Sequence, residues 1–223
     1  MRMALSIQIS KFVNIWCGSR IFTNFRIASS TLFIRRFAAI RYLYNMRKLK
    51  NEELGRMSAD EFRSAEKLPI VVVLDNVRSA YNVGSVFRTA DAFPIESLYL
   101  CGITCFPPHK EINKTALGAH ETVSWKYFPT TREAMAELKQ LGYKIYAVEQ
   151  AESSLILDQF LASEAGSLTS KLALVFGHEV EGVKQEIVDL CDGCIEIPQG
   201  GTKHSLNIAV SAGVVLWEFF RNR

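Results

Sequence analysis

The chain has 223 residues, of which 48% are hydrophobic and 22% charged, so it is long enough to bury one sizeable core and predicts a single folded domain. Its net charge of +3 hides an asymmetry: residues 1–50 carry 10 Lys/Arg and no Asp/Glu, and the remainder carries 16 Lys/Arg against 23 Asp/Glu. The main body therefore has a net charge of −7, which excludes strong non-specific attraction to phosphate backbones.

Residues 1–45 form a basic N-terminal extension that precedes the domain predicted for residues 46–223. This segment is acid-free and has three possible explanations: a transit-type presequence, a nucleic-acid-binding arm, or upstream sequence translated from a start codon assigned too early. We favour the last, because charged helical sequence begins only at Met46. A membrane span is not expected, since cations interrupt every run of about 20 apolar residues. These cations are Lys11, Arg20, Arg26, Arg35 and Arg36.

The five cysteines are an odd number without a disulfide framework, which indicates a reducing compartment and predicts a cytoplasmic protein. Cys191 and Cys194 could in principle join Cys101 and Cys105 in a four-cysteine metal site. The two pairs belong to different strand ends, however, so we expect free thiols and no metal.

The body predicts alternating strands and helices. Asn51–Ala65 has the pattern of an amphipathic helix, and Ile70–Leu74 is a run of five aliphatic residues that predicts a central strand buried on both faces. Asn82 is a fair N-cap for the helix that follows. Further strands are expected at Ser97–Cys101, Thr122–Tyr127, Tyr143–Glu149, Leu172–Phe176 and Cys194–Pro198, with helices at Glu111–Leu117 and Thr131–Leu141 and a short one within Leu157–Ser170. This alternation predicts an α/β fold with a mostly parallel sheet flanked by helices.

Polar residues gather at three of the predicted strand ends. On the helix after the first strand, Gly84 and Ser85 clear space beside Arg88, and this face suits a phosphate, although Arg88 could equally pair with Asp91. Glu179 lies in a glycine-bounded turn after a buried strand, where α/β sheets bind ligands, or it only favours a helix N-terminus through the dipole.

The third polar cluster lies between the last predicted strand and the terminal helix. Gly200–Gly201 is expected to turn the backbone where a side chain would clash, and Ser205 and Asn207 precede an apolar helix. The aromatic end of this helix, Trp217–Phe220, indicates either core or a dimer face.

Several common sites are excluded by missing motifs. There is no G-x-G-x-x-G after the first strand, no Walker sequence and no G-x-S-x-G, so a standard dinucleotide site, a P-loop and a serine hydrolase are not supported.

Three segments together resemble motifs 1, 2 and 3 of the SpoU/TrmH family of SPOUT RNA 2′-O-methyltransferases, in the family's order. NVGSVFRTADAF carries Asn82 and Arg88, LVFGHEVEG carries Glu179, and IPQGGTKHSLNIAVSAGVVLWE carries Ser205 and Asn207. The resemblance covers the chain from about Met46 to the C-terminus. It implies a homodimer with a C-terminal trefoil knot, S-adenosylmethionine (SAM) as methyl donor, and transfer to a ribose 2′-hydroxyl of RNA, of tRNA first and rRNA next.

The resemblance also implies roles for individual residues. Arg88, Asn82, Glu179, Ser205 and Asn207 would be catalytic, with Arg88 clamping the adjacent phosphate. Gly177, Ile197 and Leu206 would contact the cofactor. Because the body is acidic, RNA would be held by a local patch. Its candidates, besides Arg88, are Arg78, Lys110, Lys114, Lys203 and His204, and for each lysine the alternative is a solvated surface charge.

Two other functions are compatible with the resemblance. A catalytically silent, knotted RNA-binding or assembly protein would bind RNA without methylating it. A small-molecule methyltransferase would bind SAM and act without RNA.

Overall fold

The computed structural model describes residues 47–163 and 170–223, so the predicted N-terminal extension up to residue 45 lies outside the described residues. The chain divides into two compact units, Met1–Arg56 and Met57–Arg223. In the first unit, the described residues contain a short 3₁₀-helix, η1 (Asn51–Leu54), followed by Gly55 at a φ of 57°. In the second unit, α3 (Ala59–Ser64) begins at a capping box on Ser58. The prediction of one continuous helix is therefore wrong, because η1 ends at Gly55 and α3 begins at a new cap, Ser58.

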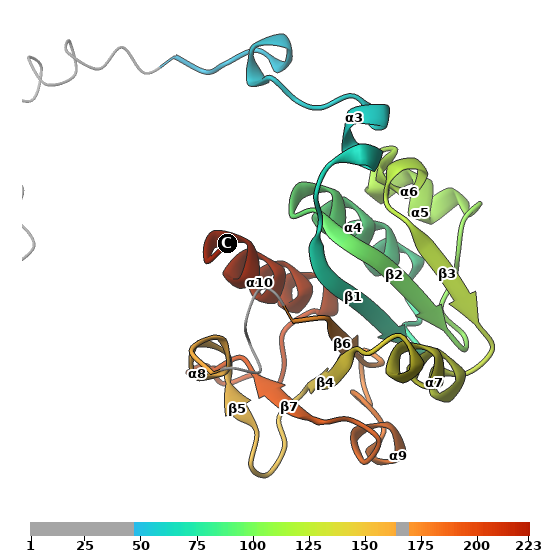
Figure 1. The fold of residues 1–223 in the computed structure, drawn as a ribbon, viewed down its shortest axis with the longest axis vertical. Coiled ribbons are helices and arrows are strands. Elements are labelled where there is room, and N and C mark those ends of the chain that lie inside the picture. The colour runs from blue at the N-terminus through green and yellow to red at the C-terminus, as the bar shows by residue number, and fades with distance from the viewer. Residues whose placement is uncertain (1–46, 164–169) are drawn as a thin grey trace, which may run out of the picture. The chain divides into compact units, whose positions relative to one another are not determined.

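The second unit is built on a seven-stranded sheet with the order β3-β2-β1-β6-β4-β7-β5 (Figure 1). All neighbouring strands in it run parallel, which confirms the predicted α/β class. The strands are β1 (Leu68–Asp75), β2 (Ile95–Cys101), β3 (Trp125–Phe128), β4 (Lys144–Val148), β5 (Leu155–Ile156), β6 (Leu172–Phe176) and β7 (Gly193–Glu196).

Helices cover both faces of the sheet and give two apolar layers. The side chains of Ile70, Val72 and Leu74 on β1 join one layer, and those of Val71 and Val73 join the other. The first layer contains residues of α4 (Ala80–Ala92), α5 (Lys110–Ala116), α6 (Ala119–Thr122), α8 (Leu157–Leu161) and α10 (Ile208–Arg221), and the second contains residues of α7 (Thr131–Gln140) and α9 (Gln185–Val188). A strand buried on both faces must be apolar throughout, which is why this aliphatic run predicts the centre of the sheet correctly.

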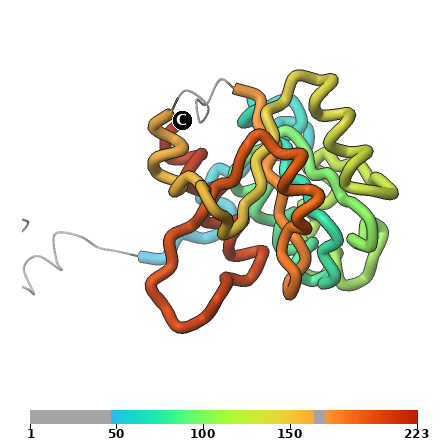
Figure 2. The backbone as a smooth tube through the Cα atoms, turned by 90° about the horizontal axis from the view of Figure 1, so that it is seen from below, coloured from blue at the N-terminus to red at the C-terminus, as the bar shows by residue number. Residues whose placement is uncertain are grey.

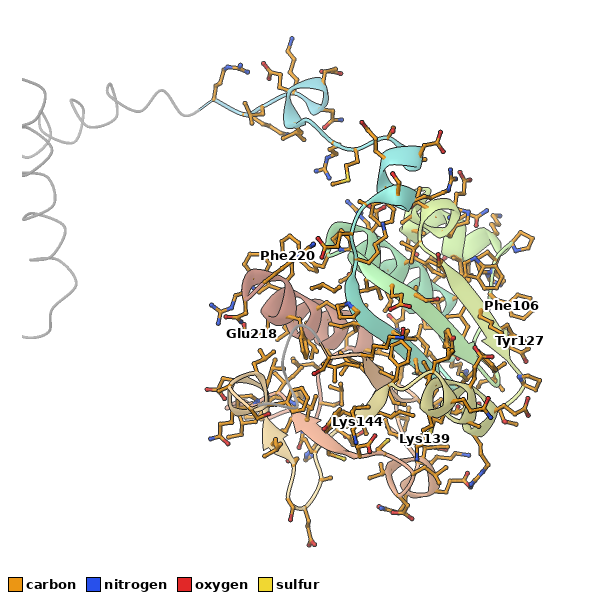
Figure 3. All side chains as sticks on the ribbon, viewed as in Figure 1. Phe106, Tyr127, Lys139, Lys144, Glu218 and Phe220 are labelled. Atoms are coloured by element: carbon orange, nitrogen blue, oxygen red, sulfur yellow. The ribbon has the colours of Figure 1, made fainter. Side chains whose placement is uncertain are left out.

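The edge of the sheet at β3 differs from the prediction. Thr122 ends α6, so the strand begins only at Trp125. Tyr127 on this strand packs against Phe106 with ring centroids 4.6 Å apart, and Figure 3 shows the two side chains together at this edge. The Tyr127 hydroxyl donates to the carbonyl of Gly102 at 3.1 Å, which fixes the loop after β2 against the edge strand.

The carboxyl ends of β6 and β7 carry two loops that bear on the site. The turn from Gly177 to Gly182 follows β6, and the segment from Ile197 to Asn207 joins β7 to α10. Figure 2 shows this last segment, in orange-red, as a wide loop at the lower edge of the backbone. Parallel α/β sheets bind ligands at these ends. Within residues 47–163 and 170–223, none of the helices combines the length and apolar character needed to cross a bilayer.

Candidate functional site

Glu179 joins the loop after β6 to the start of α4. Its Oε1 accepts hydrogen bonds from the backbone N–H of Ser79 at 2.9 Å and from the Asn82 amide at 2.9 Å. Its Oε2 accepts from the backbone N–H of Arg78 at 3.0 Å. One carboxylate therefore satisfies three donors from a segment about 100 residues earlier in the chain.

The environment of this carboxylate keeps it ionised. Burial on its own raises the pKa of Glu179, but the hydrogen bonds from Ser79, Asn82 and Arg78 together outweigh that effect, and the pKa is lowered from its ordinary value. The side chain is half-buried, and among residues 47–163 and 170–223 it forms no ion pair, so hydrogen bonds alone stabilise its charge there. This is a carboxylate placed to organise backbone.

Asn82 lies within the first turn of α4 and is not the N-cap of this helix. Ser79 is the N-cap of α4 and accepts the N–H of Asn82 at 3.3 Å, so the prediction of Asn82 as N-cap is wrong. Because the cap is provided three residues earlier, the Asn82 amide is free to donate to Glu179, and its Oδ1 accepts from Asn207 Nδ2 at 3.2 Å. Asn207 is the N-cap of α10 through its Oδ1, which accepts from Ala209 N–H at 2.9 Å. Asn82, Glu179 and Asn207 thus form one network.

An open cleft of about 430 Å³ lies beside this network. Its walls come from the end of β4, the turn after β6, and the segment before α10. The predicted cofactor contacts Gly177, Ile197 and Leu206 all line it, and so do Glu179, Ser205 and Asn207. Glu149 and Gln150 also line the cleft, although no motif in the sequence predicts a role for them.

The turn after β6 is tight because two glycines bring its ends together. A Cβ atom on Gly177 would lie 2.1 Å from the carbonyl carbon of Gly182, so no larger residue fits at this position without moving backbone. The backbones of His178 and Gly182 exchange two hydrogen bonds, of 3.0 and 2.9 Å. By contrast, the prediction for Gly200 and Gly201 is wrong: a Cβ atom on either would meet open space, and neither has a positive φ.

Arg88 does not line the cleft. It lies on the exposed face of α4, six residues beyond Asn82, which corresponds to about 9 Å along the helix axis. Among the described residues it makes no ion pair, and Asp91 instead accepts a hydrogen bond from the Thr122 hydroxyl at 3.1 Å. The sequence predicts that Gly84 clears space beside Arg88, but the structure gives a different reason for this glycine. A Cβ atom there would strike Thr115 and Ile112 of α5. Gly84 therefore serves the packing of the two helices.

The other candidate residues are placed as follows. The side chains of Arg78, Lys110, Lys203 and His204 are exposed. Lys114 is also exposed, with its Nζ 5.8 Å from the ring centroid of Tyr81.

Ser205 is exposed at the cleft, and within the described parts of the chain its hydroxyl makes no hydrogen bond. Its catalytic role stays a prediction.

The cysteines in the described residues are free thiols. Burial, and then the neighbouring Cys194, raise the pKa of Cys191 to about 12, so this thiol stays protonated and unreactive at neutral pH. No three His, Cys, Asp or Glu side chains gather closely enough to hold a metal ion in residues 47–163 and 170–223.

The fold and site together define a parallel α/β protein with a ligand cleft at the carboxyl ends of its strands, where one polar network ties the turn after β6 and the segment before α10 to the start of α4. The model of the SpoU rRNA Methylase family matches residues 69–217, a range that contains the whole network. The chain therefore belongs to this family.

Relatives of assigned activity are similar over most of the chain. A tRNA (guanosine(18)-2′-O)-methyltransferase of Thermus thermophilus is 31% identical over 171 residues, which cover 77% of this chain and 84% of the relative. The 23S rRNA (guanosine-2′-O-)-methyltransferase RlmB of Vibrio vulnificus is 28% identical over 172 residues, covering 77% of this chain and 67% of the relative.

Solved structures share the fold. The A. aeolicus TrmH/SpoU tRNA modifying enzyme matches with a TM-score of 0.64 and 28% identity, over 74% of this chain and 80% of that one. An AdoMet-bound rRNA methyltransferase from Sinorhizobium meliloti matches with a TM-score of 0.63 and 25% identity, over 72% of this chain and 60% of that one.

Proposed function

We propose that this protein is a SAM-dependent RNA methyltransferase that transfers a methyl group to a ribose 2′-hydroxyl, of tRNA first and of rRNA next. The observation that carries the proposal is the network of Asn82, Glu179 and Asn207, which joins the three family motifs at one cleft. The two relatives described above act on tRNA and on rRNA, and both are 2′-O-methyltransferases by name.

The cleft fits the methyl donor. A volume of about 430 Å³ is within the range of small-molecule sites. Ile197 and Leu206 provide apolar walls, and Gly177, which also lines the cleft, lets the backbone of Gly182 approach so that the turn keeps its shape. When bound, SAM supplies an electrophilic methyl group on its sulfonium. The contribution of the chain is to orient the donor and the ribose for in-line transfer.

Arg88 is proposed to clamp the phosphate next to the target ribose. A guanidinium has a pKa above about 12 and is not a base at neutral pH, but it binds phosphate with two parallel hydrogen bonds. Its side chain is exposed and has no ion-pair partner among the described residues, so it is available for that contact. The clamp would hold the 2′-oxygen in line and stabilise the charge that develops on it, with the phosphate as one possible proton acceptor.

Because Arg88 lies outside the cleft of its own subunit, we propose that a homodimer completes the site. The exposed face of α10 carries Val210, Val214 and Trp217 at 51%, 38% and 49% exposure, and α10 packs against α4. Covering this apolar face with a second copy would bury it and would bring Arg88 of one subunit near the site of the other. In this proposal the loops after β6 and β7 form the trefoil knot, and the protein works in the reducing cytoplasm.

RNA would be gripped by a local patch of cations. Arg78, Lys110, Lys114, Lys203 and His204 are exposed and are the candidates, with Arg88. Since the body is acidic, we expect recognition by RNA shape and a splayed nucleotide, with a modest salt dependence.

The test is methyl transfer from tritiated SAM to unmodified tRNA and rRNA transcripts. The expected product is label in alkali-resistant dinucleotides, because a 2′-O-methyl group blocks cleavage of its own linkage. Arg88→Ala is expected to abolish the label, and Arg63→Ala, which removes an exposed arginine paired with Asp60 on α3, serves as the matched control. Label on bases, label without RNA, or RNA binding without label would each contradict the proposal.

A further inference from the structure

The dipeptide Glu149–Gln150, directly after β4, contacts both loops that form the cleft. Glu149 Oε2 accepts a hydrogen bond from the backbone N–H of Val183 at 3.0 Å, at the end of the turn after β6. Gln150 Nε2 donates to the carbonyl of His204 at 2.8 Å, in the segment before α10. Two neighbouring side chains thus reach two loops that are separated from each other by about 20 residues.

The turn after β6 is shaped to receive the Glu149 carboxylate. Gly182 has a φ of 67°, a conformation that favours glycine, and a Cβ atom there would lie 2.2 Å from Glu149 Oε2. The missing side chain is what lets the carboxylate reach the N–H of Val183. Two local constraints therefore favour glycine at this position: the positive φ and the close approach of the Glu149 carboxylate.

The dipeptide is itself held in place by the sheet. The backbone N–H of Glu149 donates to the carbonyl of Ile195 on β7 at 3.1 Å, and Glu149 Oε1 accepts the N–H of Gln150 at 3.0 Å. The carboxylate is therefore oriented by the sheet end before it contacts the loop. Through these bonds, Glu149 holds the turn after β6 at a fixed distance from the ends of the strands.

The two loops are also linked through Asn82 on α4, which donates to Glu179 of the turn and accepts from Asn207 of the opposite segment. The turn after β6 is closed on itself by the pairing of His178 with Gly182, and His178 Nδ1 accepts the N–H groups of Val180 and Glu181 at 3.2 and 3.3 Å. These bonds give the turn its shape, but they do not fix its distance from the opposite wall. Glu149 and Gln150 connect the turn and the opposite segment to one rigid point.

We infer that Glu149 is a positioning residue for cofactor binding, assisted by Gln150, and that it sets the separation of the two loops across the cleft. The inference rests on the proposed function in one respect, namely that the ligand of this cleft is SAM. Neither residue needs to contact the reacting atoms. Loss of the Glu149 anchor is expected to weaken the affinity for SAM and to leave RNA affinity unchanged.

The experiment compares Glu149→Ala, Glu149→Gln and Gln150→Ala in the full chain. Glu152→Ala is the matched control, because Glu152 is exposed, lies three residues away and makes no hydrogen bond with the described residues. We expect Glu149→Ala to raise the Kd and the KM for SAM at least tenfold and to change the KM for RNA less than twofold. Gln150→Ala should raise the SAM constants about threefold. Glu149→Gln, which retains an acceptor oxygen, should recover most of the affinity.

Hydrogen exchange provides a second readout that does not use SAM. In Glu149→Ala the amide of Val183 should exchange at least tenfold faster, and peptides covering residues 203–207 should change in Gln150→Ala. Unchanged exchange at Val183, or wild-type SAM affinity in a folded Glu149→Ala protein, would overturn the inference. If Glu149→Ala does not fold, wild-type SAM affinity together with wild-type exchange over residues 203–207 in Gln150→Ala would overturn it. Failure of the wild-type protein to bind SAM would instead refute the proposed function, and Val183 exchange would still decide whether Glu149 anchors the loop.

Discussion

Replacing Glu179 with glutamine tests the central network most directly. The carboxylate accepts three hydrogen bonds, and a glutamine oriented to keep its oxygen toward Ser79 and Asn82 would present an NH₂ group to the N–H of Arg78. The variant loses one of the three bonds and removes the charge from the other two, and a hydrogen bond to a charged group contributes about 1.5–3 kcal/mol. The site is only half-buried, so water can bond the backbone N–H of Arg78 in the variant. We therefore expect a loss of about 1–2 kcal/mol in the free energy of unfolding at pH 7.

The pH dependence of this loss gives the reasoning a second test. The pKa of Glu179 is lowered in the folded state, so its contribution is fully present above the ordinary value of 4.5 and is lost as the pH falls through the folded-state pKa. Urea unfolding of both proteins should show a difference that is constant near neutral pH and shrinks below about pH 4.5. Glu181→Gln, an exposed substitution in the same turn, should match the wild type. A difference below about 0.5 kcal/mol at pH 7, or one that persists in acid, would refute the account.

Substitutions at three residues, Gly177, Asn207 and Arg88, separate the parts of the site. Gly177→Ala should raise the Kd for SAM, measured by isothermal titration calorimetry, at least tenfold because its Cβ atom meets the backbone of Gly182. Gly200→Ala should leave this Kd unchanged, because its Cβ atom meets open space. Asn207→Asp should keep the helix cap but lose methyl transfer and the hydrogen bond donated to Asn82, whereas Ala at this position should cost about 1 kcal/mol more of stability because it also loses the cap; equal melting temperatures for the two variants would contradict the capping role. Arg88→Lys should retain stability and lose at least tenfold in kcat, since a lysine cannot bind phosphate in bidentate fashion, and a wild-type kcat would remove the clamp from the mechanism.

The sequence predicts the sheet well where burial dominates. The aliphatic runs of β1 and β6 are buried on both faces, and such strands have one pattern only. Helix starts are less predictable, because Ser79 and Asn82 have similar capping preferences and only the tertiary contact with Glu179 decides between them.

Site residues divide in the same way. Gly177, Glu179 and Asn207 belong to motifs, and the structure gathers them at one cleft, as the strand ends predict. Glu149 was missed because it is an ordinary carboxylate at a strand end, and its partner Val183 is 34 residues away with nothing in either local pattern to join them. The tight passage predicted at Gly200 is found instead at Gly177, because a glycine pair indicates permitted backbone freedom and not the approach of another segment.

The network that joins Asn82 to Glu179 and Asn207 closes chain segments of 97 and 125 residues. Contacts of such high sequence separation form late in folding, because loop-closure entropy must be overcome before they contribute. During synthesis, the first half of the sheet is complete long before Asn207 leaves the ribosome. The cleft is lined in part by residues 204–208 and Ser211, so it is complete only once this late segment has joined the sheet.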